Sequence, residues 1–248
     1  VSACGLTTSS IPYEDGIFEI EFDFIEHQLT IKTSEDRSET ILLEPKSVAD
    51  FYKETMQKLD SLGIRAEIRT KPDEIPDAIP FAEDETHKSY DPEYASRFWR
   101  ALVEVDKIFT EFRSRFIGKV SPVHFFWGSF DLAVTRFSGR RAPEREGADS
   151  ITREAYSHEV ISHGFWAGGN GMDSAFYAYA APEPDGLKSA QIKPDKAFYS
   201  QEMSEFFLMY EDVRQAKNPE ETLLNFLNST YEAAANLAKW DRQELERN

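Results

Sequence analysis

Hydrophobic and polar residues alternate strictly near the start of the chain. The apolar positions are separated by acidic ones and comprise Phe18, Ile20, Phe22 and Phe24. A period of two places these four side chains on one face, which predicts a half-buried β-strand. Shorter stretches of the same kind predict further strands over residues 29–33, 40–43 and 64–70, so the first third of the chain is expected to form a β-meander with one helix.

Three segments carry the apolar spacing and the end signals of helices. Ser47 is expected to cap the first helix, which ends at Gly63. The pair Asp91-Pro92 is a strong start for a second, long helix that continues to Gly118. Asn218 followed by Pro219 begins a long C-terminal helix with an apolar face.

The second half of the chain carries four further apolar runs that predict strands, over residues 123–127, 132–137, 156–165 and 175–181. Strands separated by single helices, without regular βαβ alternation, favour an α+β fold with mostly antiparallel sheets. A proline-rich, acidic connector divides the pattern. We therefore expect two lobes, residues 1–80 and 91–248, each with strands packed on helices, although one continuous domain is also compatible with the pattern.

Composition and charge narrow the possible partners. The formal net charge is −17, which opposes binding to nucleic acid or to an anionic membrane surface. The longest apolar runs fall far short of the roughly 20 residues needed to cross a bilayer. The single cysteine, Cys4, excludes an internal disulfide and favours a reducing cytoplasm. A start at Val1 rather than Met is compatible with a missing or processed N-terminal segment.

The stretch from Ser121 to Pro143 is the most unusual in the chain and holds the first group of candidate site residues. These are the possible acid or base residues His124 and Asp131, the aromatic Trp127, and the arginines Arg136, Arg140 and Arg141. Guanidinium groups bind carboxylates and phosphates in a bidentate manner, so the arginines are candidates for a small-anion site. The alternative is that they pair with surface carboxylates, and that His124 and Trp127 belong to the core.

A second cluster, from Tyr156 to Trp166, holds Tyr156 as a candidate ligand-binding residue and His158 with Glu159 as a candidate acid and base. His158 and His163 are five positions apart, so their side chains diverge on a strand or a helix, and we predict no metal site. A structural role for the whole cluster is the alternative. The glycine-rich run Gly168–Gly171 lacks the surrounding strand and helix of a phosphate-binding loop, and no cofactor is expected.

Several long motifs resemble a largely bacterial family that is known only as a domain of unknown function. They include Ser89-Tyr-Asp-Pro-Glu-Tyr-Ala95, Ser121-Pro-Val-His-Phe-Phe-Trp-Gly-Ser-Phe-Asp131 with its continuation to Pro143, Arg153-Glu-Ala-Tyr-Ser-His-Glu-Val160 and Gly164-Phe-Trp166. The resemblance covers nearly the whole chain and implies no activity. It also implies a family N-terminal portion rich in Trp and His that this chain lacks, and it marks His163 as atypical.

Two hypotheses of different classes follow. In the first, a pocket of the second lobe binds or transforms a small anionic or polar metabolite. Arg136, Arg140 and Arg141 would hold the anion there, and Trp127 and Tyr156 would form the walls. In the second, the protein is a non-enzymatic interaction module and these residues are structural. Unpaired arginines around a pocket would favour the first hypothesis, and arginines paired with carboxylates would favour the second.

Overall fold

The computed structural model describes residues 1–72, 75–169 and 171–247, in two compact units, Val1–Val103 and Glu104–Asn248. The division falls inside helix α2 (Pro92–Ser114) rather than in the proline-rich connector. Asp73 and Glu74 of that acidic connector lie outside the described residues. No helix in the described ranges is both long enough and apolar enough to cross a bilayer.

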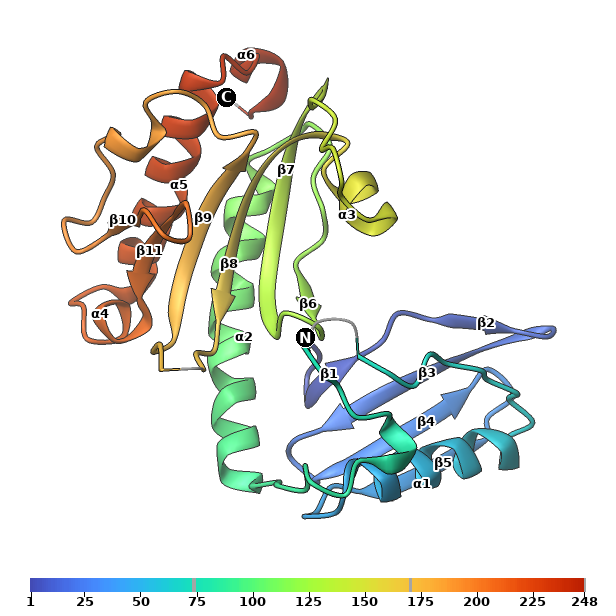
Figure 1. Cartoon of the computed structure of the whole chain (residues 1–248). Helices are drawn as coiled ribbons and strands as arrows, with labels where there is room; N and C mark the ends of the chain where they lie inside the picture. Colours follow the sequence, from blue (N-terminus) through green and yellow to red (C-terminus); the bar gives the residue numbers. More distant parts are fainter. Residues whose placement is uncertain (73–74, 170, 248) are drawn as a thin grey trace. The chain divides into compact units, whose positions relative to one another are not determined.

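The first unit is an antiparallel sheet packed against one helix (Figure 1). The sheet has the order β1-β3-β4-β5, with β2 paired to β3. Its elements are β1 (Gly5–Thr7), β2 (Ile11–Tyr13), β3 (Gly16–Asp23), β4 (Gln28–Thr33), β5 (Ser38–Leu42) and α1 (Val48–Ser61). Phe18, Leu29 and Ile31 from the strands meet Leu59 and Leu62 in the core of this unit.

The predicted starts of the helices are confirmed at the level of single hydrogen bonds, whereas α2 ends at Ser114, before the expected stop at Gly118. The Ser47 hydroxyl accepts from the Asp50 backbone N–H at 3.1 Å, and Asp91 accepts from the N–H groups of Glu93 and Tyr94 at 2.9 and 3.0 Å. These oxygens satisfy N–H groups that have no partner inside the helix. The Asn218 side chain does the same for Glu221 at 3.3 Å.

One predicted strand is wrong. Residues 64–70 form no strand, although Ile64 is buried in the core. Ile68 is 51% exposed, and none of the described strands pairs with this segment. Strand-like apolar spacing gives a strand only where a neighbouring backbone is available to form a ladder, and none of the described strands supplies one here.

The second unit is built on an antiparallel sheet of six strands in the order β10-β11-β9-β8-β7-β6. The strands are β6 (His124–Phe126), β7 (Asp131–Arg141), β8 (His158–Trp166), β9 (Ala175–Ala181), β10 (Phe198–Ser200) and β11 (Glu205–Met209). The helical segments are α3 (Ser150–Ala155), α4 (Tyr210–Arg214), α5 (Pro219–Leu237), α6 (Arg242–Leu245) and the 3-10 turn η2 (Leu187–Ser189). A further 3-10 turn, η1 (Phe81–Glu83), belongs to the first unit. Together the two units confirm an α+β fold with a long C-terminal helix.

The two faces of the six-stranded sheet differ in what covers them. Helix α5 and the C-terminal part of α2 lie on one face (Figure 1), where the ring of His163 meets Phe112 at 4.8 Å between centroids. Alternation along the strands sends other side chains to the opposite face. We call this opposite face the tyrosine face, and define it by Asp131, Thr135, Ser162, Gly164, Trp166, Tyr177, Tyr179 and Phe207.

Candidate functional site

Asp131 is the most tightly held acidic residue of the tyrosine face. It stands at the start of β7, is 5% exposed, and accepts hydrogen bonds from the hydroxyl groups of Ser129 and Tyr177. Burial and the nearby Asp131 carboxylate raise the pKa of Tyr177 well above its usual value, so Tyr177 stays a hydrogen-bond donor at neutral pH. Asp131 is therefore a buried carboxyl group held in place by two hydroxyl donors.

Gly164 makes this arrangement possible. It lies on β8 between Ala133 of β7 and Tyr177 of β9. A Cβ atom at Gly164 would lie 2.2 Å from the Tyr177 ring, so only glycine leaves room for the phenol to cross β8 toward Asp131.

A second acidic group of the tyrosine face was not identified from the sequence. Glu205 begins β11, and burial together with the charge of Asp131 raises the pKa of its carboxyl to about 7. A carboxyl with such a pKa exchanges its proton near neutrality, as a general acid or base must. Its sequence neighbours, Ser204 and Phe206, gave no motif that would have marked it.

Hydroxyl groups extend from the tyrosine face toward the loop between β7 and β8. The hydroxyls of Tyr156 and Tyr179 are 3.0 Å apart, and those of Thr135 and Ser162 are 2.9 Å apart. Tyr156 follows α3 directly, so it connects the sheet with the loop that carries the arginines.

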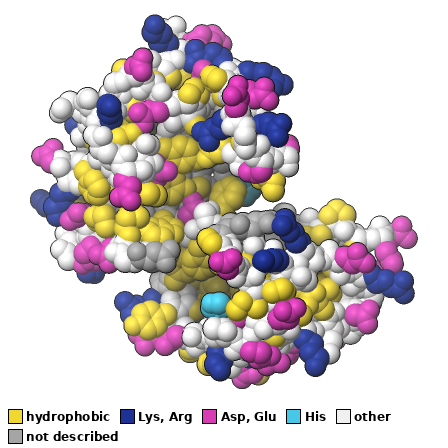
Figure 2. All heavy atoms as spheres, in the orientation of Figure 1, with side chains coloured by type: hydrophobic (Ala, Val, Ile, Leu, Met, Phe, Trp, Pro, Cys, Tyr) yellow, Lys and Arg dark blue, Asp and Glu magenta, His cyan; other side chains and the backbone are white. Residues whose placement is uncertain are grey.

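That loop forms a pocket of about 510 Å³, within the range typical of small-molecule sites. Its basic lining residues are Arg141, Arg145 and Arg153, its acidic ones are Glu144 and Glu154, and Tyr156 forms part of its wall. We call it the arginine pocket. Figure 2 shows basic side chains gathered in this part of the second unit, near α3 and the end of β7.

The guanidinium groups of the arginine pocket are not neutralised by contact. Among the described residues, no carboxylate lies within 4.0 Å of a nitrogen of Arg141, Arg145 or Arg153. Arg145 lies over the ring of Tyr156, with 4.0 Å from its Cζ atom to the ring centroid, and Arg153 donates to the Ala148 carbonyl at 3.1 Å. Stacking holds a guanidinium flat and leaves its edge free to donate.

Comparison with known proteins identifies the family of the chain. A model of a family of unknown function, DUF5996, matches residues 1–247. The chain belongs to this family. No curated protein and no solved structure matches it. The function of this DUF5996 protein therefore has to be argued from its own residues.

Arg140 and Glu159 of the DUF5996 chain pair with each other. The Arg140 Nη2 atom lies 2.7 Å from the Glu159 carboxylate and 2.6 Å from the Ala238 carbonyl at the end of α5. Ser138 donates to the same carboxylate at 2.8 Å. Arg140 thus caps α5 and joins it to β8, outside the arginine pocket.

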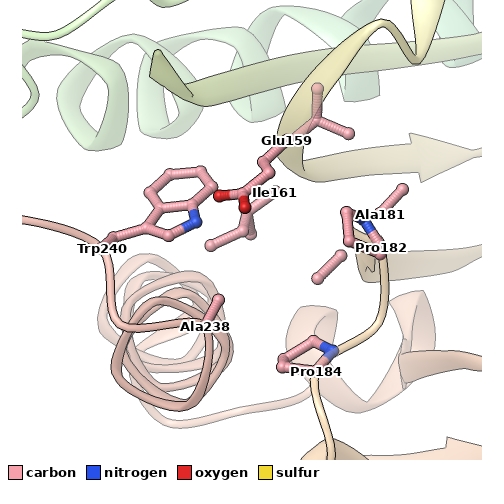
Figure 3. A pocket seen from close by; sticks show the side chains of 9 residues that line it. Glu159, Ile161, Ala181, Pro182, Pro184, Ala238 and Trp240 are labelled. Carbon is pink, nitrogen blue, oxygen red and sulfur yellow. The ribbon is translucent and has the colours of Figure 1, made fainter. Parts of the chain in front are cut away.

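Glu159 also lines a smaller cavity of about 130 Å³ (Figure 3). Trp240 stands on one side of it and Pro182 and Pro184 on the other, with Glu159 and Ile161 between them. This volume is well below the range of small-molecule sites, and the carboxylate is already engaged by Arg140.

Arg136 lies on the helix-covered face and is 2% exposed. Its guanidinium lies 3.6 Å from the ring centroid of Phe112 and 4.2 Å from that of Tyr231, and it donates to the Phe112 carbonyl. Burial lowers the pKa of Arg136 to about 10, so it is charged at neutral pH. It does not line the arginine pocket.

The remaining candidates lie along the edges of the sheet. His124 is exposed on the edge strand β6, and its ring meets Phe126 at 5.8 Å. Trp127 is 49% exposed and contacts Phe125. His158 pairs with Arg141 across the β7–β8 ladder, and its Nδ1 atom is 3.0 Å from the Ser157 hydroxyl. Of the sequence-predicted site residues, the structure brings Arg141 and Tyr156 to one pocket and places His158 beside it.

Two further kinds of site, a metal centre and a reactive thiol, were sought among the described residues of this DUF5996 protein. Among the described residues no group of three or more His, Cys, Asp or Glu side chains is arranged to hold a metal ion. Burial raises the pKa of the Cys4 thiol to about 11, so the thiol is protonated at neutral pH and is a weak nucleophile. In the glycine-rich run, Asn170 lies outside the described residues.

Proposed function

We propose that this DUF5996 protein binds a small anionic metabolite, carrying a carboxylate or phosphate group, in the arginine pocket. The observation that carries the proposal is the convergence of Arg141, Arg145 and Arg153 on one pocket of suitable volume without an ion-pair partner among the described residues. In a protein of net charge −17, carboxylates are abundant, yet these three arginines are left available.

Tyr156 gives the proposal its second support. Its ring is held by Arg145 and its hydroxyl by Tyr179, so the wall of the pocket is positioned before a ligand arrives. A preorganised wall reduces the entropy lost on binding. His158, beside Arg141, and Glu205, on the tyrosine face, are the groups we propose for proton transfer if the ligand is transformed.

The rival proposal is a non-enzymatic interaction module. Arg136 and Arg140 support it, because their guanidinium groups are already used within the fold. In either case we propose a cytoplasmic protein on the basis of its single cysteine, and no nucleic-acid partner on the basis of its charge.

Titration calorimetry with inorganic phosphate and with succinate, at constant ionic strength, tests the anion site. We expect the double substitution Arg141→Ala/Arg145→Ala to weaken binding by about tenfold or more, because charge-assisted hydrogen bonds are lost. The matched control is Lys188→Ala/Lys217→Ala, which removes two exposed charges outside the pocket. Equal weakening by both pairs, or no binding to the wild type, would contradict the proposal and favour the interaction module.

A further inference from the structure

A second pocket of the same unit, of about 380 Å³, has a very different lining. Its large side chains are Trp166, Met172, Phe198, Met203, Phe207 and Met209. The chain contains only four methionines, so three of them are gathered at this one place. We call it the methionine pocket.

The strand register explains why a hollow forms here. Ala175 of β9 pairs with Trp166 of β8 on one side and with Met209 of β11 on the other. A small side chain between two large ones leaves space above the sheet. Phe198 and Phe207 pair across β10 and β11, with ring centroids 6.1 Å apart, and extend the apolar floor.

The loop after β8 closes one side of the pocket and is held by its own backbone. Gly169 and Met172 exchange two hydrogen bonds of 2.9 Å, and the Ser174 hydroxyl donates to the Ala167 carbonyl at 2.6 Å. Gly169 lies against the Trp166 indole, since a Cβ atom there would be 3.5 Å from the ring. The described part of this wall is therefore shaped without a ligand.

The pocket is open to solvent, and the charge on its lining is negative. Met172, Phe198 and Met203 are 38%, 48% and 52% exposed, which is unusual for large apolar side chains gathered in one place. Among the described lining residues, Glu202 is the only charged one, and no ion pair or hydrogen bond engages its carboxylate.

We propose that the methionine pocket binds an organic cation with an apolar body, namely a protonated or quaternary amine. Aromatic faces attract cations, and a desolvated contact of this kind contributes more than an exposed one. Polarisable thioethers adapt to an apolar body, and the Glu202 carboxylate supplies the opposite charge at the rim. The acidic protein as a whole also raises the local concentration of cations. This inference does not depend on the arginine pocket, which has the opposite charge preference.

Methyl NMR of the protein labelled with ¹³C-methyl methionine provides a direct test, because the chain has only four such methyl groups. Met56 lies on α1 in the first unit, packed against the core there, and serves as an internal control. The probes are benzyltrimethylammonium as the cation, 3-phenylpropan-1-ol as the neutral compound and 3-phenylpropionate as the anion. We expect the cation to shift the signals of Met172, Met203 and Met209 and to leave that of Met56 unchanged.

Two substitutions separate the contributions to binding. Phe198→Leu keeps an apolar side chain but removes the ring, and should weaken the binding of the cation by about threefold while changing that of the neutral alcohol less. Glu202→Gln should also weaken the cation by about threefold and leave the alcohol unchanged. Glu220→Gln, an exposed residue in the first turn of α5, is the control that removes one charge elsewhere.

The outcomes decide the matter. Preferential binding of the cation, weakened by Phe198→Leu and Glu202→Gln but not by Glu220→Gln, supports the proposal. Equal or tighter binding of the neutral alcohol or of the anion overturns the assignment to cations. Absence of a selective shift of the three pocket methionines overturns the site itself.

Discussion

At the scale of single residues, two buried polar side chains on the helix-covered face need explanation. Arg136 is enclosed by Phe112 and Tyr231, and its aromatic contacts and the bond to the Phe112 carbonyl offset part of the loss of water, while its buried Nε–H has no partner among the described residues. His163 is 0% exposed and lies 3.1 Å from the Thr230 hydroxyl through its Nε2 atom. Since the Thr230 hydroxyl donates to the Phe226 carbonyl, His163 acts as the donor to it.

This environment makes His163 sensitive to acid. Burial, and then the positive charge of Arg136, lower the pKa of His163 well below its usual 6.5. The unfolded chain therefore binds a proton at His163 more readily than the folded chain. It follows that neutral His163 does not oppose folding above pH 6.5, and that its contribution lowers the free energy of unfolding as the pH falls below that value.

We predict that His163→Gln makes the free energy of unfolding less dependent on pH below 6.5. The slope should decrease by about 1.4 kcal/mol per pH unit relative to the wild type, because one fewer proton is taken up on unfolding. Urea denaturation at several pH values between 8 and 5 measures it. Parallel curves for the two proteins would show that His163 is not the group responsible.

At the scale of elements, the antiparallel pairing of β8 with β7 and β9 determines which side chains meet on the tyrosine face. Gly164 lets the Tyr177 phenol cross β8, Asp131 accepts a hydrogen bond from its hydroxyl, and the Tyr179 ring stacks beside the Tyr177 ring with 6.1 Å between centroids. The hydrogen-bonded pair thus comes from β9 and β7, and β8 between them leaves room for it at Gly164. The adjacent Glu205 owes its raised pKa first to burial and then to the fixed charge of Asp131.

Gly164→Ala is expected to destabilise the protein by about 1–3 kcal/mol, because the added methyl group displaces the Tyr177 ring and breaks its hydrogen bond to Asp131. A double-mutant cycle with Tyr177→Ala, followed by chemical denaturation, checks the mechanism. With the ring removed, the alanine at position 164 should add little further destabilisation. Additive effects of the two substitutions would place the strain elsewhere.

At the scale of the whole molecule, the excess of acidic residues outweighs the scattered ion pairs. Several of these pairs have both side chains exposed, such as Lys107–Glu104, and such pairs contribute little to stability. A net charge of −17 therefore acts mainly through repulsion between like charges.

We expect sodium chloride to stabilise the protein between low salt and about 0.5 M, because screening weakens this repulsion more than it weakens the few ion pairs. The midpoint of urea unfolding measures the effect. A midpoint that falls with added salt would indicate that the ion pairs dominate. Phosphate at the same ionic strength should stabilise further, through binding to the arginine pocket.

The amino-acid sequence alone determined the α+β class, the starts of the main helices and most strands of the first unit. These features depend on local patterns: alternation at Phe18–Phe24, and the caps at Ser47, Asp91 and Asn218. It also marked Arg136, Arg140 and Arg141 as candidates for an anion site, and it indicated the family by resemblance.

Tertiary structure decided which of those side chains meet. Arg136, Arg140 and Arg141 lie within one strand, yet they point to the core, to the end of α5 and to a pocket respectively. No local pattern distinguishes them, because their surroundings come from α2, α5 and the loop of α3. Glu205 and the methionine pocket also depend on strand pairing over long sequence separations, so only the fold brings their residues together.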